Sequence, residues 1–163
     1  MVQWEMHLNL RIFMMEFQLI QEKIFEIRGN RVMLDFDLAE LYRLETRAFK
    51  QAARRNPNRF PVDFMFQLSK DEWTELITIC DKLPKSIKYS PALPLAFKEQ
   101  GVAMLSSVLR SQSVVEVNIS IMRTFVLMRQ DAIAFYKELT KLMKEFKKVK
   151  QNPIDHWTVS TIL

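Results

Sequence analysis

The sequence predicts an α+β fold: a small β-hairpin or sheet packed with helix-turn-helix-like helices, followed by a long C-terminal coiled-coil helix. Three observations predict it: a turn signal between two β-branched segments, two short amphipathic helices in succession, and an apolar heptad repeat near the C-terminal end. The chain has 163 residues, 48% of them hydrophobic and 26% charged, which suffices for one globular domain with an appendage.

The predicted hairpin comprises residues 18–28 and 31–34. Gly29 and Asn30 lie between its arms, and Gly29 can adopt the positive φ that a two-residue hairpin turn requires. β-Branched residues flank this turn on both sides, as is typical of strands. The segment therefore predicts the first two strands of a small sheet.

Two short helices are predicted after the hairpin. Asp35 or Asp37 is expected to cap the first, residues 38–42, because short polar side chains accept hydrogen bonds from free amides at a helix start. Thr46 is expected to cap the second, residues 47–56, which a following proline ends. Two helices of about two turns, joined by a turn of about three to four residues, form the skeleton of a helix-turn-helix.

A further strand and helix are predicted in the middle of the chain. Residues 64–68 form an apolar run typical of a strand. Ser69 and Glu72 have the spacing of a capping box, which predicts a helix over 70–81. Residues 82–96 contain three prolines and no clear period, so we expect a loop there.

The last part of the chain predicts two more helices, over residues 98–110 and 113–150. In the second, every position of a 4-3 alternation that begins at Ile121 is apolar, over about four heptads. A single helix cannot bury such a seam, so we expect self-association; the alternative is that the half up to Met128 packs on the domain's own core. Lysines surround the later half of this apolar stripe, which favours a helix whose outer face is solvated. The alternative is that these lysines contact a polyanion. The predicted oligomerisation residues are Phe125, Met128, Ala132, Phe135, Leu139, Leu142, Phe146 and Val149.

The composition excludes several kinds of site. Cys80 is the only cysteine, which rules out an intramolecular disulfide and a thiolate zinc site. His7 and His156 lie near opposite ends without another ligand at metal spacing, so we expect no metal and no cofactor. No apolar run approaches the roughly twenty residues of a membrane span, and the first residues lack a signal-peptide layout. We therefore expect a cytoplasmic protein.

The basic charge of the chain is concentrated in residues 43–59. The formal net charge is +5, and this segment alone carries six basic residues against one acidic residue, Glu45. On a helical wheel with about 100° per residue, basic and amide side chains fall on one face, and Phe49 with three alanines falls on the other. This face suits nucleic acid; the alternative is a solvated face, although such faces usually mix signs. The predicted DNA-binding residues are Arg43, Thr46, Arg47, Lys50, Gln51, Arg54, Arg55, Asn56 and Arg59.

These residue types match the chemistry of duplex DNA. Guanidinium groups bind phosphate or the O6/N7 edge of guanine with two hydrogen bonds, and Gln51 can pair with adenine. Arg43 and Arg59 flank the predicted helix, where they can contact phosphates, and Thr46 with the helix start can add backbone amides.

Several segments of the chain resemble one known family. They are IQEKIFEIRG (20–29), VMLDFDLAELY (32–42), RN (55–56), RFP (59–61), DFMFQL (63–68), Phe97, EQGVAMLSSVL (99–109), EVNI (116–119) and IMR (121–123). Together they resemble the phage ORF-six N-terminal domain, a relative of the KilA-N domain. The resemblance implies a DNA-binding domain of phage, prophage and bacterial regulators, often followed by a coiled coil, with antirepressor-like roles in some relatives.

With this resemblance, the chain divides into four predicted parts. They are an N-terminal extension (1–17), a KilA-N-related DNA-binding domain (18–129), a coiled-coil extension of the last helix (130–150) and a tail (151–163).

Two functions stay open at this point. The leading hypothesis is a phage-type regulator that reads double-stranded DNA with the basic helix, 46–56, as a homodimer or higher homo-oligomer. The alternative is an antirepressor-like module that binds another regulator, such as a repressor protein, rather than DNA. We do not expect an enzyme: Asp35, Asp37 and Glu40 can be imagined as a metal-dependent nuclease site, but the two aspartates suit a helix start.

Overall fold

The computed structural model describes residues 2–81 and 83–151, without the side chains of residues 2–4, 6, 7, 10 and 149–151. Two compact units are present, Met1–Phe125 and Val126–Leu163. The predicted tail, 151–163, lies outside the described residues except for its first position. No helix in the described part is long and apolar enough to cross a membrane.

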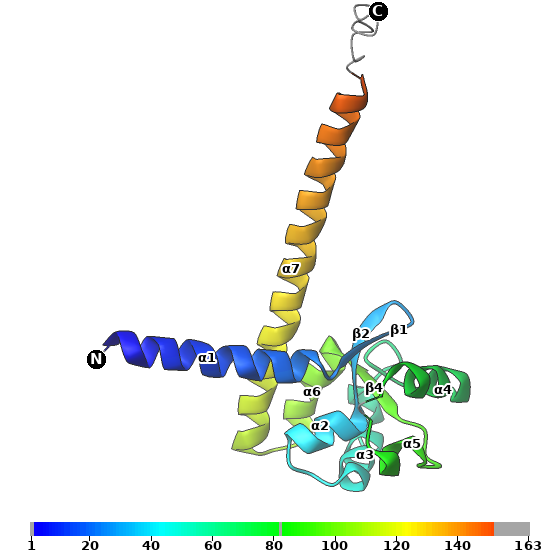
Figure 1. Cartoon of the computed structure of the whole chain (residues 1–163). Helices are drawn as coiled ribbons and strands as arrows, with labels where there is room; N and C mark the ends of the chain where they lie inside the picture. Colours follow the sequence, from blue (N-terminus) through cyan, green and yellow to red (C-terminus); the bar gives the residue numbers. More distant parts are fainter. Residues whose placement is uncertain (1, 82, 152–163) are drawn as a thin grey trace, which may run out of the picture. The chain divides into compact units, whose positions relative to one another are not determined.

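Four antiparallel strands form a sheet in the first unit, which confirms the predicted α+β class (Figure 1). The strands are β1 (Ile24–Ile27), β2 (Asn30–Leu34), β3 (Met65–Gln67) and β4 (Leu95–Lys98), in the spatial order β1-β2-β4-β3. β4 begins inside the segment predicted as a loop, 82–96, so that prediction is wrong at its end. The strand depends on pairing with β2 and β3, which lie far away in the sequence, and a local pattern does not reveal such partners.

The β1–β2 hairpin turns one residue earlier than predicted. Arg28 and Gly29 form the turn, with φ values of 54° and 69°, and Asn30 already pairs with Ile27. Two consecutive positive φ values are typical of a type I′ turn, whose twist matches that of the flanking strands. The Asn30 side chain supports the unusual conformation of Arg28 by donating from Nδ2 to the Arg28 carbonyl at 2.9 Å.

Seven α-helices accompany the sheet in the described part of the chain. They are α1 (Val2–Gln21), α2 (Asp35–Leu41), α3 (Thr46–Arg54), α4 (Lys70–Ile79), α5 (Lys85–Lys88), α6 (Glu99–Val108) and α7 (Gln112–Gln151), with a 3₁₀ turn at Pro57–Arg59. Two corrections follow. Residues 18–21, predicted as part of the hairpin, continue α1, and α5 lies within the predicted loop.

Of the predicted helix caps, the structure confirms the capping box of α4. The Ser69 amide donates to the Glu72 carboxylate at 2.8 Å, and the Glu72 amide donates to Ser69 Oγ at 3.2 Å. The other predicted caps are wrong. Asp35 and Asp37 lie inside the first turn of α2 and not before it. Their carboxylates form ion pairs with Lys50 and Lys23. Thr46 is the first helical residue of α3 and therefore does not precede it.

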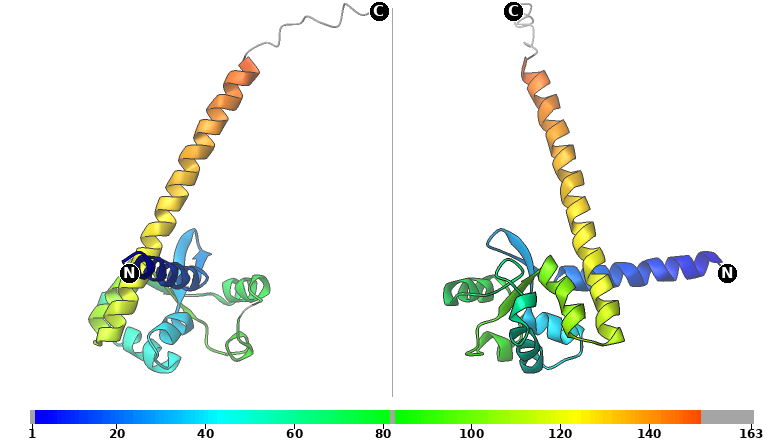
Figure 2. Two further views of the ribbon diagram at one scale, coloured as in Figure 1. Left: turned by 60° about the vertical axis from the view of Figure 1, so that its left-hand side comes forward. Right: turned by 180° about the vertical axis from the view of Figure 1, so that it is seen from behind.

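Two hydrophobic layers cover opposite faces of the sheet. Figure 2 shows the helices that surround the sheet. Side chains alternate along a strand, so Met33 of β2 faces one layer while Val32 and Leu34 face the other. The first layer joins the sheet to α2, α3, α6 and the start of α7, and contains Leu38, Tyr42, Phe49, Phe97, Leu105 and Ile121. The second joins the sheet to α4 and α5, and contains Phe36, Phe66, Leu68, Trp73 and Leu83.

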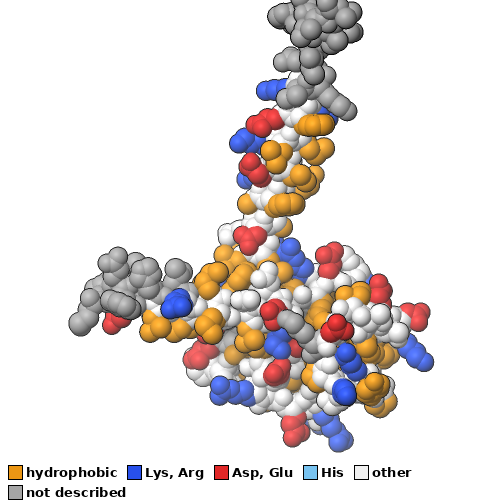
Figure 3. Space-filling view, in the orientation of Figure 1, with side chains coloured by type: hydrophobic (Ala, Val, Ile, Leu, Met, Phe, Trp, Pro, Cys, Tyr) orange, Lys and Arg blue, Asp and Glu red, His pale blue; other side chains and the backbone are white. Residues whose placement is uncertain are grey.

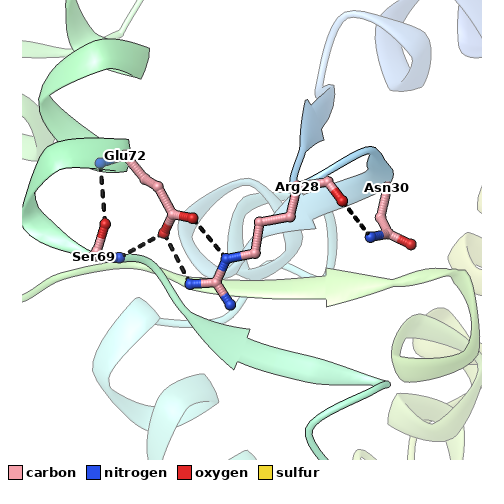
Figure 4. Close-up of polar contacts among 4 residues, drawn as sticks. All are labelled: Arg28, Asn30, Ser69 and Glu72. Atoms are coloured by element: carbon pink, nitrogen blue, oxygen red, sulfur yellow. Dashed lines mark hydrogen bonds and ion pairs between the residues drawn. The ribbon is translucent and has the colours of Figure 1, made fainter.

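The tip of the hairpin is tied to the start of α4 (Figure 4). Arg28 donates from Nε and Nη2 to the two carboxylate oxygens of Glu72, at 2.6 and 3.0 Å. Its guanidinium also lies 4.2 Å from the centre of the Phe66 ring. The hydrogen bonds from Arg28 and from the Ser69 amide lower the pKa of Glu72 to about 2.

A glycine allows α6 to approach the sheet closely. A Cβ atom on Gly101 would lie 2.4 Å from the carbonyl oxygen of Phe64, just before β3. Any larger residue at this position would push the helix away from the backbone of that segment.

Candidate nucleic-acid interface

Helices α2 and α3 are joined by four residues, as the predicted skeleton requires. Arg43 lies in this turn with φ of 57°, a conformation that glycine more often supplies. The Leu44 amide donates to the Ala39 carbonyl at 2.8 Å, which closes the C-terminal end of α2. Arg43 thus takes the positive-φ position of the turn, and this segment contains no glycine.

The inner face of α3 packs on the core through an aromatic side chain. Phe49 is buried between Tyr42 and Phe97, with ring centres at 6.1 and 5.4 Å. Ala53 is buried beside it, as the helical wheel predicts, whereas Ala48 is exposed. This packing directs the opposite face of α3 to solvent.

Arginines dominate the exposed face of α3. Arg47, Gln51, Arg54 and Arg55 are exposed, and with Thr46 they line an open groove of ≈ 670 Å³. α3 contains no acidic residue, so no carboxylate of its own neutralises these guanidinium groups. The arrangement can bind phosphate through several arginines while amide and guanidinium groups contact base edges.

The opposite wall of this groove was not predicted as part of a site. It is formed by Ser90 and Ala92, which follow α5. Neither residue type signals binding, and only the fold brings this segment beside α3.

Lys50 lies at the edge of this groove but is held by the protein. Its ammonium is 3.1 Å from Asp35 Oδ2 and donates to the Leu93 carbonyl at 3.2 Å. The Asp35 side chain is only 1% exposed, and its Oδ2 also accepts from the Leu95 amide at 2.8 Å. Burial raises the pKa of Asp35, although the Leu95 amide and Lys50 oppose this rise. Lys50 therefore neutralises a buried carboxylate, unlike the arginines around it.

The remaining predicted residues flank the arginine face. Asn56 donates from Nδ2 to the Ala52 carbonyl at 2.8 Å and so closes the end of α3. Arg59 is exposed and donates to Ser107 Oγ at 2.8 Å, and Arg43 is exposed in the turn before α3. The structure thus brings Arg47, Arg54 and Arg55 together along one groove. It gives Lys50, Asn56 and Arg59 partners within the protein.

A buried hydrogen bond links α2 to α7. The Tyr42 hydroxyl donates to Asn118 Oδ1, and Asn118 Nδ2 donates to the Val102 carbonyl at 3.1 Å. Burial raises the pKa of Tyr42, which keeps the phenol protonated as a donor. The helix before the arginine face is therefore fixed to the part of α7 that belongs to the first unit.

The carboxylates considered for a nuclease site are paired with lysines. Lys23 lies 3.1 Å from Asp37 Oδ1 and 2.7 Å from Glu40 Oε2. Burial raises the pKa of Asp37, whose Oδ2 has no hydrogen-bond partner among the described residues. No cluster of histidine, cysteine and carboxylate side chains in the described part is arranged to hold a metal ion.

These carboxylates border a second groove, of ≈ 630 Å³. Its lining combines acidic residues with apolar ones and one lysine. It includes Glu22, Lys23, Asp37, Glu40, Glu45, Phe25, Phe36, Leu44, Leu83 and Ile87. The sequence pattern did not predict this groove, because its residues come from segments that are separated along the chain.

The predicted oligomerisation stripe divides into two parts. Ile121 and Phe125 are buried in the core of the first unit, as the alternative prediction for the early half proposed. In the later half the apolar side chains are exposed along one side of α7 (Figure 3). They include Phe135, Leu139, Leu142 and Phe146, whereas the side chain of Val149 lies outside the described part.

Fold and site together define a small α+β domain in which the second helix of a short helical pair, α3, exposes an arginine-bearing face. Residues 22–108 match the ORF6N domain, so the chain belongs to this family. The match confirms the resemblance identified from the sequence and indicates a phage-type regulatory family. Comparisons with curated proteins and with solved structures gave no match.

Proposed function

We propose that this protein is a DNA-binding regulator of phage type, which binds duplex DNA through α3 and self-associates through α7. The exposed arginine face of α3 carries the proposal: three arginines and a glutamine line one groove, without an acidic residue in the helix. Phosphate contacts would supply affinity, and Gln51 with Arg47 is suited to base edges.

Salt dependence tests the electrostatic part of this proposal. Five exposed arginines lie in or beside the helical pair: Arg43, Arg47, Arg54, Arg55 and Arg59. If all five neutralise phosphates, the slope of log K against log salt is about −4.5, and removal of two reduces it to about −2.7. Lys50 is left out of this number because it is paired with Asp35.

The experiment compares two double variants of the full chain. Arg54→Ala with Arg55→Ala should weaken binding to duplexes selected from a random pool and lower the salt slope, without changing the melting temperature. The matched control replaces Arg110 and Arg123, which are exposed outside α3, by alanine and should leave binding unchanged. Equal losses in both variants, or binding that does not depend on salt, would contradict the proposal.

The second candidate is an antirepressor-like module that binds another regulator. The groove beside α2 favours it, because apolar residues bordered by acidic ones can accept a basic, partly apolar segment of a partner protein. A pull-down from a lysogenic host, run with the wild type and with Leu44→Arg, distinguishes the two functions. Capture of a regulator by the wild type but not by Leu44→Arg, together with no binding of the wild type to duplex DNA, would support this candidate.

The proposal includes no catalytic step. The three carboxylates considered for a nuclease site are paired with lysines: Asp35 with Lys50, and Asp37 and Glu40 with Lys23. Cleavage of bound DNA in the presence of magnesium or manganese would overturn this part.

A further inference from the structure

α7 exposes apolar side chains along its later half (Figure 3). The exposed positions make this face wider than a two-stranded coiled coil requires. Beside the predicted seam, three further apolar residues are exposed. The seam comprises Ala132, Phe135, Leu139, Leu142 and Phe146, and the flank comprises Ile133, Tyr136 and Met143. At about 100° per residue these eight positions cover about 180° of the helix, whereas a two-stranded seam uses the a and d positions only. So wide a face is typical of a helix with more than one helical neighbour.

α1 exposes a matching stripe. Leu8, Ile12, Met15 and Leu19 follow a 4-3-4 spacing and are 47–72% exposed. This stripe lies on another side of the helix than Ile20, which is buried and anchors the end of α1 in the core. The stripe therefore does not serve the packing of α1 on its own domain.

The two apolar surfaces have nearly the same length. From Leu8 to Leu19 the α1 stripe extends about 16 Å, and from Ile133 to Met143 the flank of α7 extends about 15 Å, at 1.5 Å per residue. The α1 stripe and the α7 flank can therefore pack against one another over about three helical turns.

The charges beside these surfaces select one orientation. Glu5 and Glu16 lie along one side of the α1 stripe, and Lys137 and Lys144 border the flank of α7 on the side away from the seam. Antiparallel packing places the glutamates alongside these lysines, whereas parallel packing would place Arg11 there. Opposite charges thus favour the antiparallel pair.

We propose that α1 of one copy packs antiparallel along the apolar flank of α7 of a second copy, so that the assembly is a helical bundle. The inference rests on the self-association that is part of the proposed function. A second copy is the occupant because this chain itself carries both members of the pair, with matching lengths and opposite flanking charges. Every copy carries both surfaces, so the contact is reciprocal and can close as a two-fold dimer.

Disulfide cross-linking between two different full-length variants tests the contact. Both carry Cys80→Ser; one adds Met15→Cys on α1 and the other Tyr136→Cys on α7, positions that are each 72% exposed. Mixing the two under mild oxidation should give a cross-linked heterodimer. The control replaces Tyr136→Cys with Lys141→Cys, on the opposite side of α7, and should give none.

Three outcomes would overturn the contact. They are no cross-link on mixing, equal cross-linking with the Lys141→Cys control, and cross-linking only within one chain that carries both Met15→Cys and Tyr136→Cys.

The mass in solution gives an independent measurement. Met15→Ser should weaken self-association about tenfold or more, because an exposed methionine loses its burial in the assembly. Asn9→Ser, a matched change elsewhere on α1, should leave it unchanged. A wild type that is monomeric at all concentrations would refute the proposed self-association. An oligomer insensitive to Met15→Ser would refute the α1 contact alone, and DNA binding through α3 is measured separately from both.

Discussion

Lys50 provides the sharpest test of which cations in α3 serve the fold and which face solvent. Lys50→Met keeps the aliphatic part of the side chain and removes the ammonium beside Asp35. Loss of one partner from a buried ion pair costs about 3–5 kcal/mol. The Lys50 side chain is 15% exposed, whereas that of Asp35 is 1% exposed, so we expect the lower end, about 3 kcal/mol of unfolding free energy at pH 7.

Protonation of Asp35 limits this loss and makes it depend on pH. Without Lys50, the folded-state pKa of Asp35 rises further above its unfolded value. An acid with a raised folded pKa destabilises the protein at high pH, and the penalty disappears as pH falls to the unfolded pKa. Protonating Asp35 in the folded protein costs about 4 kcal/mol at pH 7 and about 1.5 kcal/mol at pH 5. These values are the upper limits on the stability that the charge of Asp35 can remove. The variant should therefore lose less stability at pH 5.

Urea unfolding at both pH values, followed through the buried Trp73, measures these differences. The double variant Asp35→Asn with Lys50→Met should recover most of the loss, because an amide oxygen can still accept from the Leu95 amide. Arg54→Ala is the matched exposed control and should change stability by less than about 0.5 kcal/mol. The reasoning is refuted if Lys50→Met is as stable as the wild type but weakens DNA binding as much as Arg54→Ala does.

Three further predictions concern the contacts that hold the domain together. Gly101→Ala should destabilise by about 1–3 kcal/mol, because its Cβ would meet the Phe64 carbonyl; melting in urea checks this, and an unchanged midpoint would contradict it. Tyr42→Phe should cost about 1–3 kcal/mol by leaving the buried Asn118 oxygen without its donor, and a wild-type midpoint would exclude that bond as a support of α2. Glu72 has a folded pKa of about 2, so its stabilisation is complete above its ordinary pKa and is lost as pH falls toward 2. Glu72→Gln should flatten the dependence of the unfolding free energy on pH between about pH 5 and about pH 2, as measured in acid titrations. An unchanged slope would show that the ion pair between Arg28 and Glu72 does not contribute to stability.

Local sequence patterns predicted the elements whose cause is local. The capping box of Ser69 and Glu72 lies within four residues, and it forms as predicted. Positive φ at Gly29 follows from its missing side chain, although pairing in the hairpin decided that the turn begins at Arg28. The arginine periodicity of α3 is likewise a property of one helix, so the exposed face could be predicted without its neighbours.

By itself, the sequence determined the α+β class, the family and the amphipathic character of the later helices. Only the tertiary structure decided how individual charged residues are used. Lys50 and Arg54 are equivalent on a helical wheel, but a buried Asp35 from α2 lies beside one and solvent beside the other. Which carboxylate is buried next to which cation depends on contacts between segments far apart in the chain. The cost of leaving such a charge unpaired in a low-dielectric interior then fixes Lys50 in the fold and leaves the arginines of α3 exposed.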